Sequence, residues 1–72
     1  MDNLPVVIGE QIKKRRKRMG LNPRELERKM GKPGYGTQVN SWERGKYMPD
    51  AWNLCDLADA LECSVDEILG RA

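Results

Sequence analysis

Residues 38–45 combine a packing side and a hydrogen-bonding side within one short segment of helical spacing. Val39, Trp42 and Glu43 follow one another at i, i+3 and i+4, which places them on the same side of a helix. The side chains toward the opposite side can all hydrogen-bond to bases or phosphates: Gln38, Asn40, Ser41 and Arg44. Such a helix can pack against the protein with its tryptophan side and leave its polar side free to enter a DNA groove.

The rest of the chain predicts the elements that hold this segment in place. Glycine and proline divide the sequence into segments of helical period, and no run alternates between apolar and polar residues. We therefore expect one all-α domain over residues 1–72, a length that allows a single modest core without metal or disulfide. The expected helices cover about residues 5–19, 23–30, 36–44, 51–61 and 65–69.

Capping residues mark where these helices begin and end. Asn22 is a favourable N-cap, and Glu25, three residues later, completes a capping box. Ser64 and Glu67 repeat this pattern before the last helix. Gly45 supplies the left-handed residue that commonly ends a helix, so it limits the polar segment on its C-terminal side.

The apolar stripe of the first helix contains a charged residue. Arg16 lies on that stripe, and Glu43 lies beside Trp42 on the inward side of the third helix. A buried charge without a partner is costly, so two such misplaced charges are expected to pair. We predict an Arg16–Glu43 ion pair that joins the first helix to the end of the third; the alternative is two partly exposed charges that never meet.

Composition argues against several functional classes. The chain has no histidine, and Cys55 and Cys63 are eight residues apart, which is not the close spacing of zinc ligands. We expect both cysteines to be small apolar fillers in a reduced environment. No enzyme, metal or cofactor is predicted, since no nucleophile has an evident base. The N-terminus resembles neither a signal peptide nor a membrane span, so we expect a soluble cytoplasmic chain.

Charge is distributed unevenly along the chain. Residues 1–48 contain twelve Lys or Arg against five Asp or Glu, whereas residues 49–72 contain one against six. This asymmetry indicates a polyanion-facing surface in the first two thirds of the chain. Composition alone leaves an ordinary solvated charge run equally open.

Short motifs follow one another in a fixed order through most of the chain. They are Ile8-Gly9-Glu10-Gln11-Ile12, Arg16, Gly20-Leu21-Asn22, Glu25-Leu26, Met30-Gly31, Val39, Trp42-Glu43-Arg44-Gly45-Lys46, Pro49-Asp50, Leu54, Leu57-Ala58-Asp59-Ala60-Leu61 and Ser64-Val65-Asp66-Glu67-Ile68-Leu69. Together they resemble the lambda-repressor-like (Cro-type, XRE family) helix-turn-helix domains of phage and bacterial transcription regulators. The resemblance implies a compact five-helix domain whose second and third helices form the helix-turn-helix, with the third in the major groove.

The resemblance also implies which residues read bases. Gln38 has the best chemistry, because its amide can bond adenine N6 and N7 together. The other expected base-reading residues are Tyr35, Gly36, Thr37, Asn40 and Ser41. Gly36 contributes no side chain, so one position that usually contacts a base in this family cannot do so through a side chain here. Tyr35 can stack on a sugar or bond a phosphate, and packing on the domain surface is an equal alternative.

Phosphates are expected at the N-terminus of the second helix, where backbone N–H groups and the helix dipole favour an anion. Asn22 and Arg24 lie at this position. A second set of phosphate contacts is expected just after the third helix, from Arg44, Lys46 and Tyr47. Two lysines of the first helix, Lys13 and Lys17, are also expected to contact phosphates. The remaining charges of the basic run in the first helix are expected to be solvated.

Two departures from the family pattern affect the junction between the second and third helices. The stretch between Gly31 and Val39 is about two residues longer than the usual turn, and Glu27 stands where the family prefers a small residue. A Glu at this close crossing would desolvate a charge unless it points aside. A longer turn could move the third helix away and make room, so the angle and register of that helix stay open.

These observations favour a sequence-specific regulator of transcription that binds double-stranded DNA, with repression as the favoured direction. Readers of this type usually bind a palindromic operator as a two-fold pair. Trp52 points away from the apolar stripe of its helix, so it is a candidate anchor of a homodimer; folding back onto Tyr47 or Met48 is the alternative.

The rival function is a protein-interaction module, antitoxin-like or a regulatory subunit, that uses the same helix pair. Binding to structured RNA lacks a platform of paired aromatics.

Overall fold

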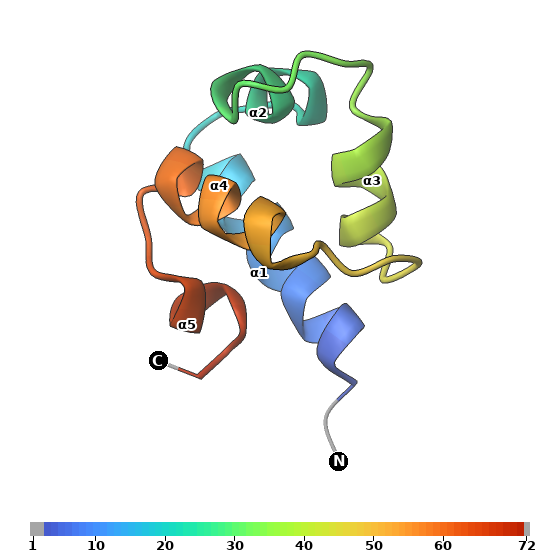
Figure 1. Ribbon diagram of the computed structural model, residues 1–72, viewed down its shortest axis with the longest axis vertical. Coiled ribbons are helices and arrows are strands. Elements are labelled where there is room, and N and C mark those ends of the chain that lie inside the picture. The colour runs from blue at the N-terminus through green and yellow to red at the C-terminus, as the bar shows by residue number, and fades with distance from the viewer. Residues whose placement is uncertain (1–2, 72) are drawn as a thin grey trace.

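Five α-helices and no strand occur in residues 3–71, the part of the chain that the computed structural model describes. They are α1 (Leu4–Arg18), α2 (Pro23–Lys29), α3 (Thr37–Glu43), α4 (Ala51–Leu61) and α5 (Val65–Ile68). The expected all-α class is confirmed, and each helix end lies within one residue of its expected position. In Figure 1, α1 passes behind α4, α2 lies across the top, and α3 and α5 lie on opposite sides.

One apolar cluster joins all five helices. Its members are Ile8, Ile12, Leu26, Val39, Trp42, Leu57, Ala58, Ala60, Leu61 and Ile68. Full burial of a side chain the size of leucine or isoleucine stabilises a fold by about 1.5–3 kcal/mol relative to its exposure. The core therefore depends on a few large side chains, and the two inward residues of α3, Val39 and Trp42, are part of it.

Both predicted capping boxes are present. The Asn22 Oδ1 atom accepts from the Glu25 backbone N–H at 2.8 Å, and Glu25 Oε1 accepts from the Asn22 backbone N–H at 2.8 Å. Ser64 and Glu67 exchange the same pair of hydrogen bonds at the start of α5. The hydrogen bonds from Ser64 lower the pKa of Glu67 below its ordinary value. These boxes fix where α2 and α5 begin.

α1 and α3 approach each other very closely at Gly9. A Cβ atom added at Gly9 would lie 2.5 Å from the carbonyl oxygen of Trp42 and 2.7 Å from that of Glu43. Any side chain here would therefore collide with the backbone of α3. Glycine at this position lets the C-terminal half of α3 lie directly on α1.

Ion pairs attach α2 and the turn that follows it to α4. Lys29 Nζ lies 3.4 Å from Glu62 Oε2, and Lys32 Nζ lies 3.1 Å from Asp56 Oδ2. Lys32 also donates to the side-chain oxygen of Asn53. The first part of the long turn therefore rests against α4.

The cysteines differ from the expectation. Cys55 is exposed because it lies three residues after Trp52 and four before Asp59, on the outward side of α4. Cys63 is half-buried, and its burial raises the pKa of the thiol. Only Cys63 packs against the core, so the prediction of two buried fillers is wrong for Cys55.

In residues 3–71, no helix is long and apolar enough to cross a membrane. The same residues contain no cluster of three or more side chains that could hold a metal ion. On α4, the Trp52 side chain is 76% exposed, which contradicts the alternative in which it folds back onto Tyr47 or Met48.

Candidate nucleic-acid interface

α3 presents one buried and one exposed side. Val39 and Trp42 are 0% and 4% exposed, respectively. The polar residues of the other side include three exposed side chains and one half-buried side chain: Thr37, Gln38 and Asn40, and then Ser41. The hydrogen-bonding groups of α3 are therefore accessible to a ligand, while its apolar groups belong to the core.

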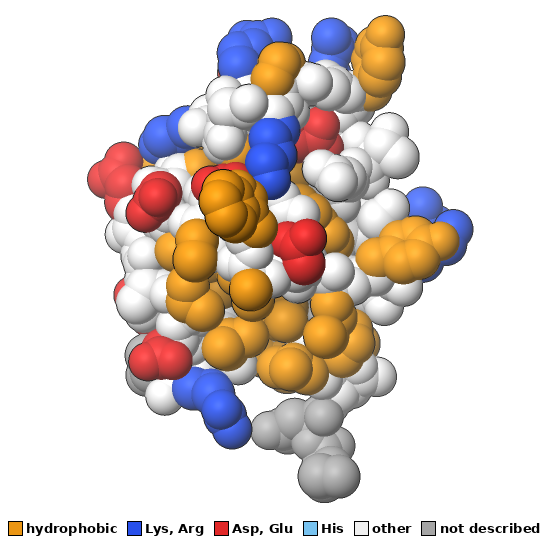
Figure 2. Space-filling model, in the orientation of Figure 1, with side chains coloured by type: hydrophobic (Ala, Val, Ile, Leu, Met, Phe, Trp, Pro, Cys, Tyr) orange, Lys and Arg blue, Asp and Glu red, His pale blue; other side chains and the backbone are white. Residues whose placement is uncertain are grey.

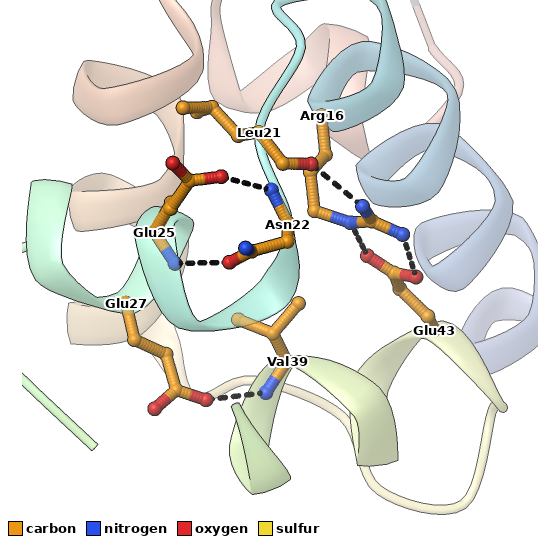
Figure 3. A network of polar contacts seen from close by, with 7 residues as sticks. All are labelled: Arg16, Leu21, Asn22, Glu25, Glu27, Val39 and Glu43. Atoms are coloured by element: carbon orange, nitrogen blue, oxygen red, sulfur yellow. Dashed lines mark hydrogen bonds and ion pairs between the residues drawn. The ribbon is translucent and has the colours of Figure 1, made fainter. Parts of the chain in front are cut away.

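The C-terminal end of α3 is held by the predicted Arg16–Glu43 pair. The guanidinium donates from Nε to Glu43 Oε2 at 2.6 Å and from Nη2 to Oε1 at 2.9 Å, as Figure 3 shows. A third donor, Nη1, bonds the carbonyl oxygen of Leu21 at 2.7 Å. Both side chains are buried, and the hydrogen bonding to Glu43 raises the pKa of Arg16. One arginine thus joins α1, the end of α3 and the residue before the N-cap of α2.

The N-terminal end of α3 is held by Glu27, the residue whose charge the close helix crossing was expected to desolvate. Its side chain does not point aside, because Glu27 is only 4% exposed. The Oε1 atom accepts from the backbone N–H of Gly36 at 3.2 Å, and Oε2 accepts from that of Val39 at 3.1 Å. Figure 3 shows the carboxylate pointing from α2 toward the start of α3. The helices remain in contact, and the desolvated charge is met by N–H groups that the start of a helix leaves without partners.

Gly36 also differs from the expectation, since it does not lie among the exposed residues of α3. It is the buried N-cap, with a left-handed φ of 85°, and it offers no side-chain cap to the helix. A Cβ atom added there would lie 3.0 Å from Pro23 Cβ and 3.2 Å from the Arg24 backbone nitrogen. The backbone of Gly36 therefore packs against the start of α2, and the first exposed residue of α3 is Thr37.

The residues expected to meet phosphate are exposed at three places around α3. Arg24 lies at the start of α2, with its guanidinium carbon 5.9 Å from the centre of the Tyr35 ring. After α3, Lys46 Nζ lies 5.6 Å from the centre of the Tyr47 ring. The other exposed members are Asn22, Arg44, Lys13 and Lys17. Figure 2 shows basic side chains over α2 at the top of the molecule and beyond α3 at the right.

The lengthened turn leaves the outward side of α3 uncovered. A hollow opens between this side and the segment that leads into α4, and Gln38, Ser41, Met48 and Asn53 are among the residues that line it. Gln38 and Ser41 are therefore reachable from solvent along the same surface.

Comparison with known proteins identifies the family. Residues 12–68 match the family model described as helix-turn-helix. The chain belongs to this family. It is also 33% identical over 63 residues to "Repressor protein C2" of Salmonella phage P22. The aligned part is 88% of this chain and 28% of the repressor, so the chain spans just over a quarter of that relative's length. No solved structure matches the chain.

The match and the phage relative confirm the lambda-repressor-like helix-turn-helix domain. The helix-turn-helix of this chain consists of α2, the turn over residues 30–36, and α3.

Sequence reasoning missed two residues that position α3. The charge of Glu27 was expected to be desolvated at the helix crossing, but the hydrogen bonds that its carboxylate accepts from Gly36 and Val39 were not foreseen. Gly9 was recognised only as part of a family motif. Its close approach to α3 depends on the tertiary arrangement, and no local pattern reports it.

Proposed function

We propose that this helix-turn-helix domain represses transcription by reading a specific duplex DNA sequence in the major groove with α3. The family match and the phage repressor relative support the class of function. The observation that carries the proposal is that α3 is fixed at both ends while its polar side stays exposed. Glu27 holds one end and the Arg16–Glu43 pair holds the other.

The base-reading residues are those on the exposed side of α3 and at its start. Gln38 reads adenine through its amide, Thr37 meets a thymine methyl, and Asn40 and Ser41 bond neighbouring base edges. Tyr35, which is 85% exposed beside Arg24, contacts the sugar-phosphate backbone at the edge of the groove. Gly36 serves as the backbone cap of the helix.

Phosphates on either side of the groove meet cations and N–H donors around α3. The contacts before α3 come from Asn22, Arg24, Lys13 and Lys17, and those after it from Arg44, Lys46 and Tyr47. Lys13 follows Gly9 by four residues and precedes Arg16 by three, and both of these α1 residues touch α3. Its helical spacing therefore directs it to the α3 side of α1.

Two copies of the domain bind a palindromic operator, because one short helix reads few base pairs. Trp52 is proposed to anchor the homodimer, since a largely exposed tryptophan offers a large apolar contact area.

Selection of binding sites from random duplexes at a stated salt concentration tests the function. We expect enrichment of a palindromic site whose half-sites are about one helical turn apart. A variant that carries both Gln38→Ala and Ser41→Ala is the matched control, and it should enrich a weaker or different sequence. Absence of enrichment by the original chain at low salt would contradict DNA reading and favour the protein-interaction alternative.

A further inference from the structure

We propose that Glu27 is a positioning residue of the DNA-binding site, whose carboxylate sets the placement of α3 and thereby the bases that α3 selects. This inference rests on the proposed function, because it concerns the selectivity of the same helix. Glu27 is buried and does not touch DNA itself. It acts through the backbone of α3.

The two oxygens of the carboxylate bond different residues of α3. Oε1 accepts from Gly36 and Oε2 from Val39, so the two bonds bracket Thr37 and Gln38. Two contacts from one planar group restrict both the distance of the helix from α2 and its rotation about its own axis. Thr37 and Gln38, two of the residues proposed to read bases, thus lie between the backbone groups that this carboxylate holds.

The buried charge of Glu27 depends on α3 remaining in this position. No ion pair joins Glu27 to a cation within residues 3–71. Its partners are the two backbone N–H groups at the positive end of α3. If α3 moved by about the length of a hydrogen bond, the carboxylate would be buried without partners, and that state is costly. The charge therefore works against alternative placements of the helix.

The other end of the long turn is fixed independently. Lys32 bonds Asp56 and Asn53 of α4, four residues before the Gly36 cap. The turn is thus attached to α4 at its beginning and to α2, through Glu27, at its end. A turn of this length would otherwise leave the start of α3 with more freedom than a short turn allows.

The first experiment compares Glu27→Ala and Glu27→Gln with the original chain on two duplexes of equal length, the enriched site and an unrelated sequence, at one salt concentration. Glu27→Ala should lower affinity for the enriched site by about tenfold or more, because a displaced Gln38 loses a bidentate base contact. Affinity for the unrelated duplex should stay level or rise, because a negative charge is removed.

Glu27→Gln separates the hydrogen bonds from the charge. It removes the same charge as Glu27→Ala but keeps one oxygen that can accept from α3. We expect it to retain a larger part of the preference for the enriched site than Glu27→Ala. Equal selectivity of the two variants would show that the hydrogen bonds accepted from α3 do not set the preference, and would overturn the positioning role argued from them.

Glu67→Ala provides the matched control. Glu67 is also a carboxylate that accepts from a backbone N–H at a helix start, but it belongs to α5, and its side chain pairs with Arg15 of α1. Its removal should cost stability without changing the ratio of the two affinities. Unfolding by denaturant confirms that all variants are folded at the assay temperature.

A second measurement does not depend on DNA. Hydrogen exchange followed by NMR should show slow exchange of the Gly36 and Val39 amides, which Glu27→Ala accelerates while the end of α3 held by Glu43 stays protected. Unchanged exchange at both amides, or an unchanged affinity ratio in folded Glu27→Ala, would refute the positioning role. If the original chain binds no duplex, the proposed function fails separately, and exchange still decides whether Glu27 holds α3.

Discussion

The backbone of Gly34 lies against the carboxylate of Glu27, so that a Cβ atom added at Gly34 would be 2.6 Å from Oε1. Gly34→Ala should therefore push the carboxylate away from the start of α3 without changing any charge. Because the displaced carboxylate would lose backbone partners while it stays buried, we expect a loss of stability of about 1–3 kcal/mol, together with a clear loss of preference for the enriched duplex. Denaturant unfolding and duplex titration measure the two effects. Retention of full selectivity would mean that the carboxylate tolerates the shift.

Gly9→Ala should destabilise the fold, although the helix propensity of alanine is about 1 kcal/mol more favourable than that of glycine. The added Cβ would meet two carbonyl oxygens of the α3 backbone, at Trp42 and Glu43, and backbone atoms cannot turn aside. Overpacking of this kind typically costs about 1–3 kcal/mol, so a net loss of stability is expected. Glu10→Ala, at an exposed neighbour on α1, is the control and should change stability little. A stabilised Gly9→Ala variant would rule out the close packing of α1 on α3.

Glu43→Ala should leave the Arg16 guanidinium buried without its carboxylate and cost about 3–5 kcal/mol in denaturant unfolding. Replacing both partners by apolar residues, Arg16→Met with Glu43→Leu, should cost much less, because no unpaired charge remains. A loss below about half a kcal/mol for Glu43→Ala would show that the pair contributes little, as exposed pairs do.

Gln38→Ala should lower affinity for the enriched duplex by about 1–3 kcal/mol and relax selection at one base pair. Stability should be unchanged, because the side chain is exposed. Titration against duplexes altered at each position in turn locates the affected base pair and provides the internal control. A uniform loss of affinity over all positions would show that Gln38 contacts the sugar-phosphate backbone of the DNA and not a base.

Arg44→Ala and Lys46→Ala should each reduce the slope of log affinity against log salt by about one unit, since each removes one phosphate contact. Lys14→Ala removes the same charge from the part of α1 beside Arg15, which pairs with Glu67 of α5, and it should leave the slope nearly unchanged. Titrations at several salt concentrations measure the slopes. Equal reductions in all three variants would indicate a diffuse charge effect.

Local patterns in the sequence were sufficient for the helices and for one long-range contact. The capping boxes at Asn22 and Ser64 lie within four consecutive residues, so their hydrogen bonds depend on local backbone geometry alone. The Arg16–Glu43 pair could be predicted from the sequence, because a charge on an apolar stripe needs a partner and these two charges are opposite in sign. The two-sided character of α3 followed from helical spacing in the same way.

The placement of α3 was decided by tertiary structure. The Glu27 carboxylate can cap α3 only if the end of a seven-residue turn brings the start of α3 next to it. The path of a turn cannot be predicted from the sequence, because a turn has no periodicity. Gly9, Gly34 and the exposed Cys55 likewise owe their roles to neighbours that are distant in sequence. The sequence by itself determined the helices, their inward sides and the class of fold, because these follow from spacing along one chain. The position of the reading surface follows from contacts between helices, which form only when the whole domain packs.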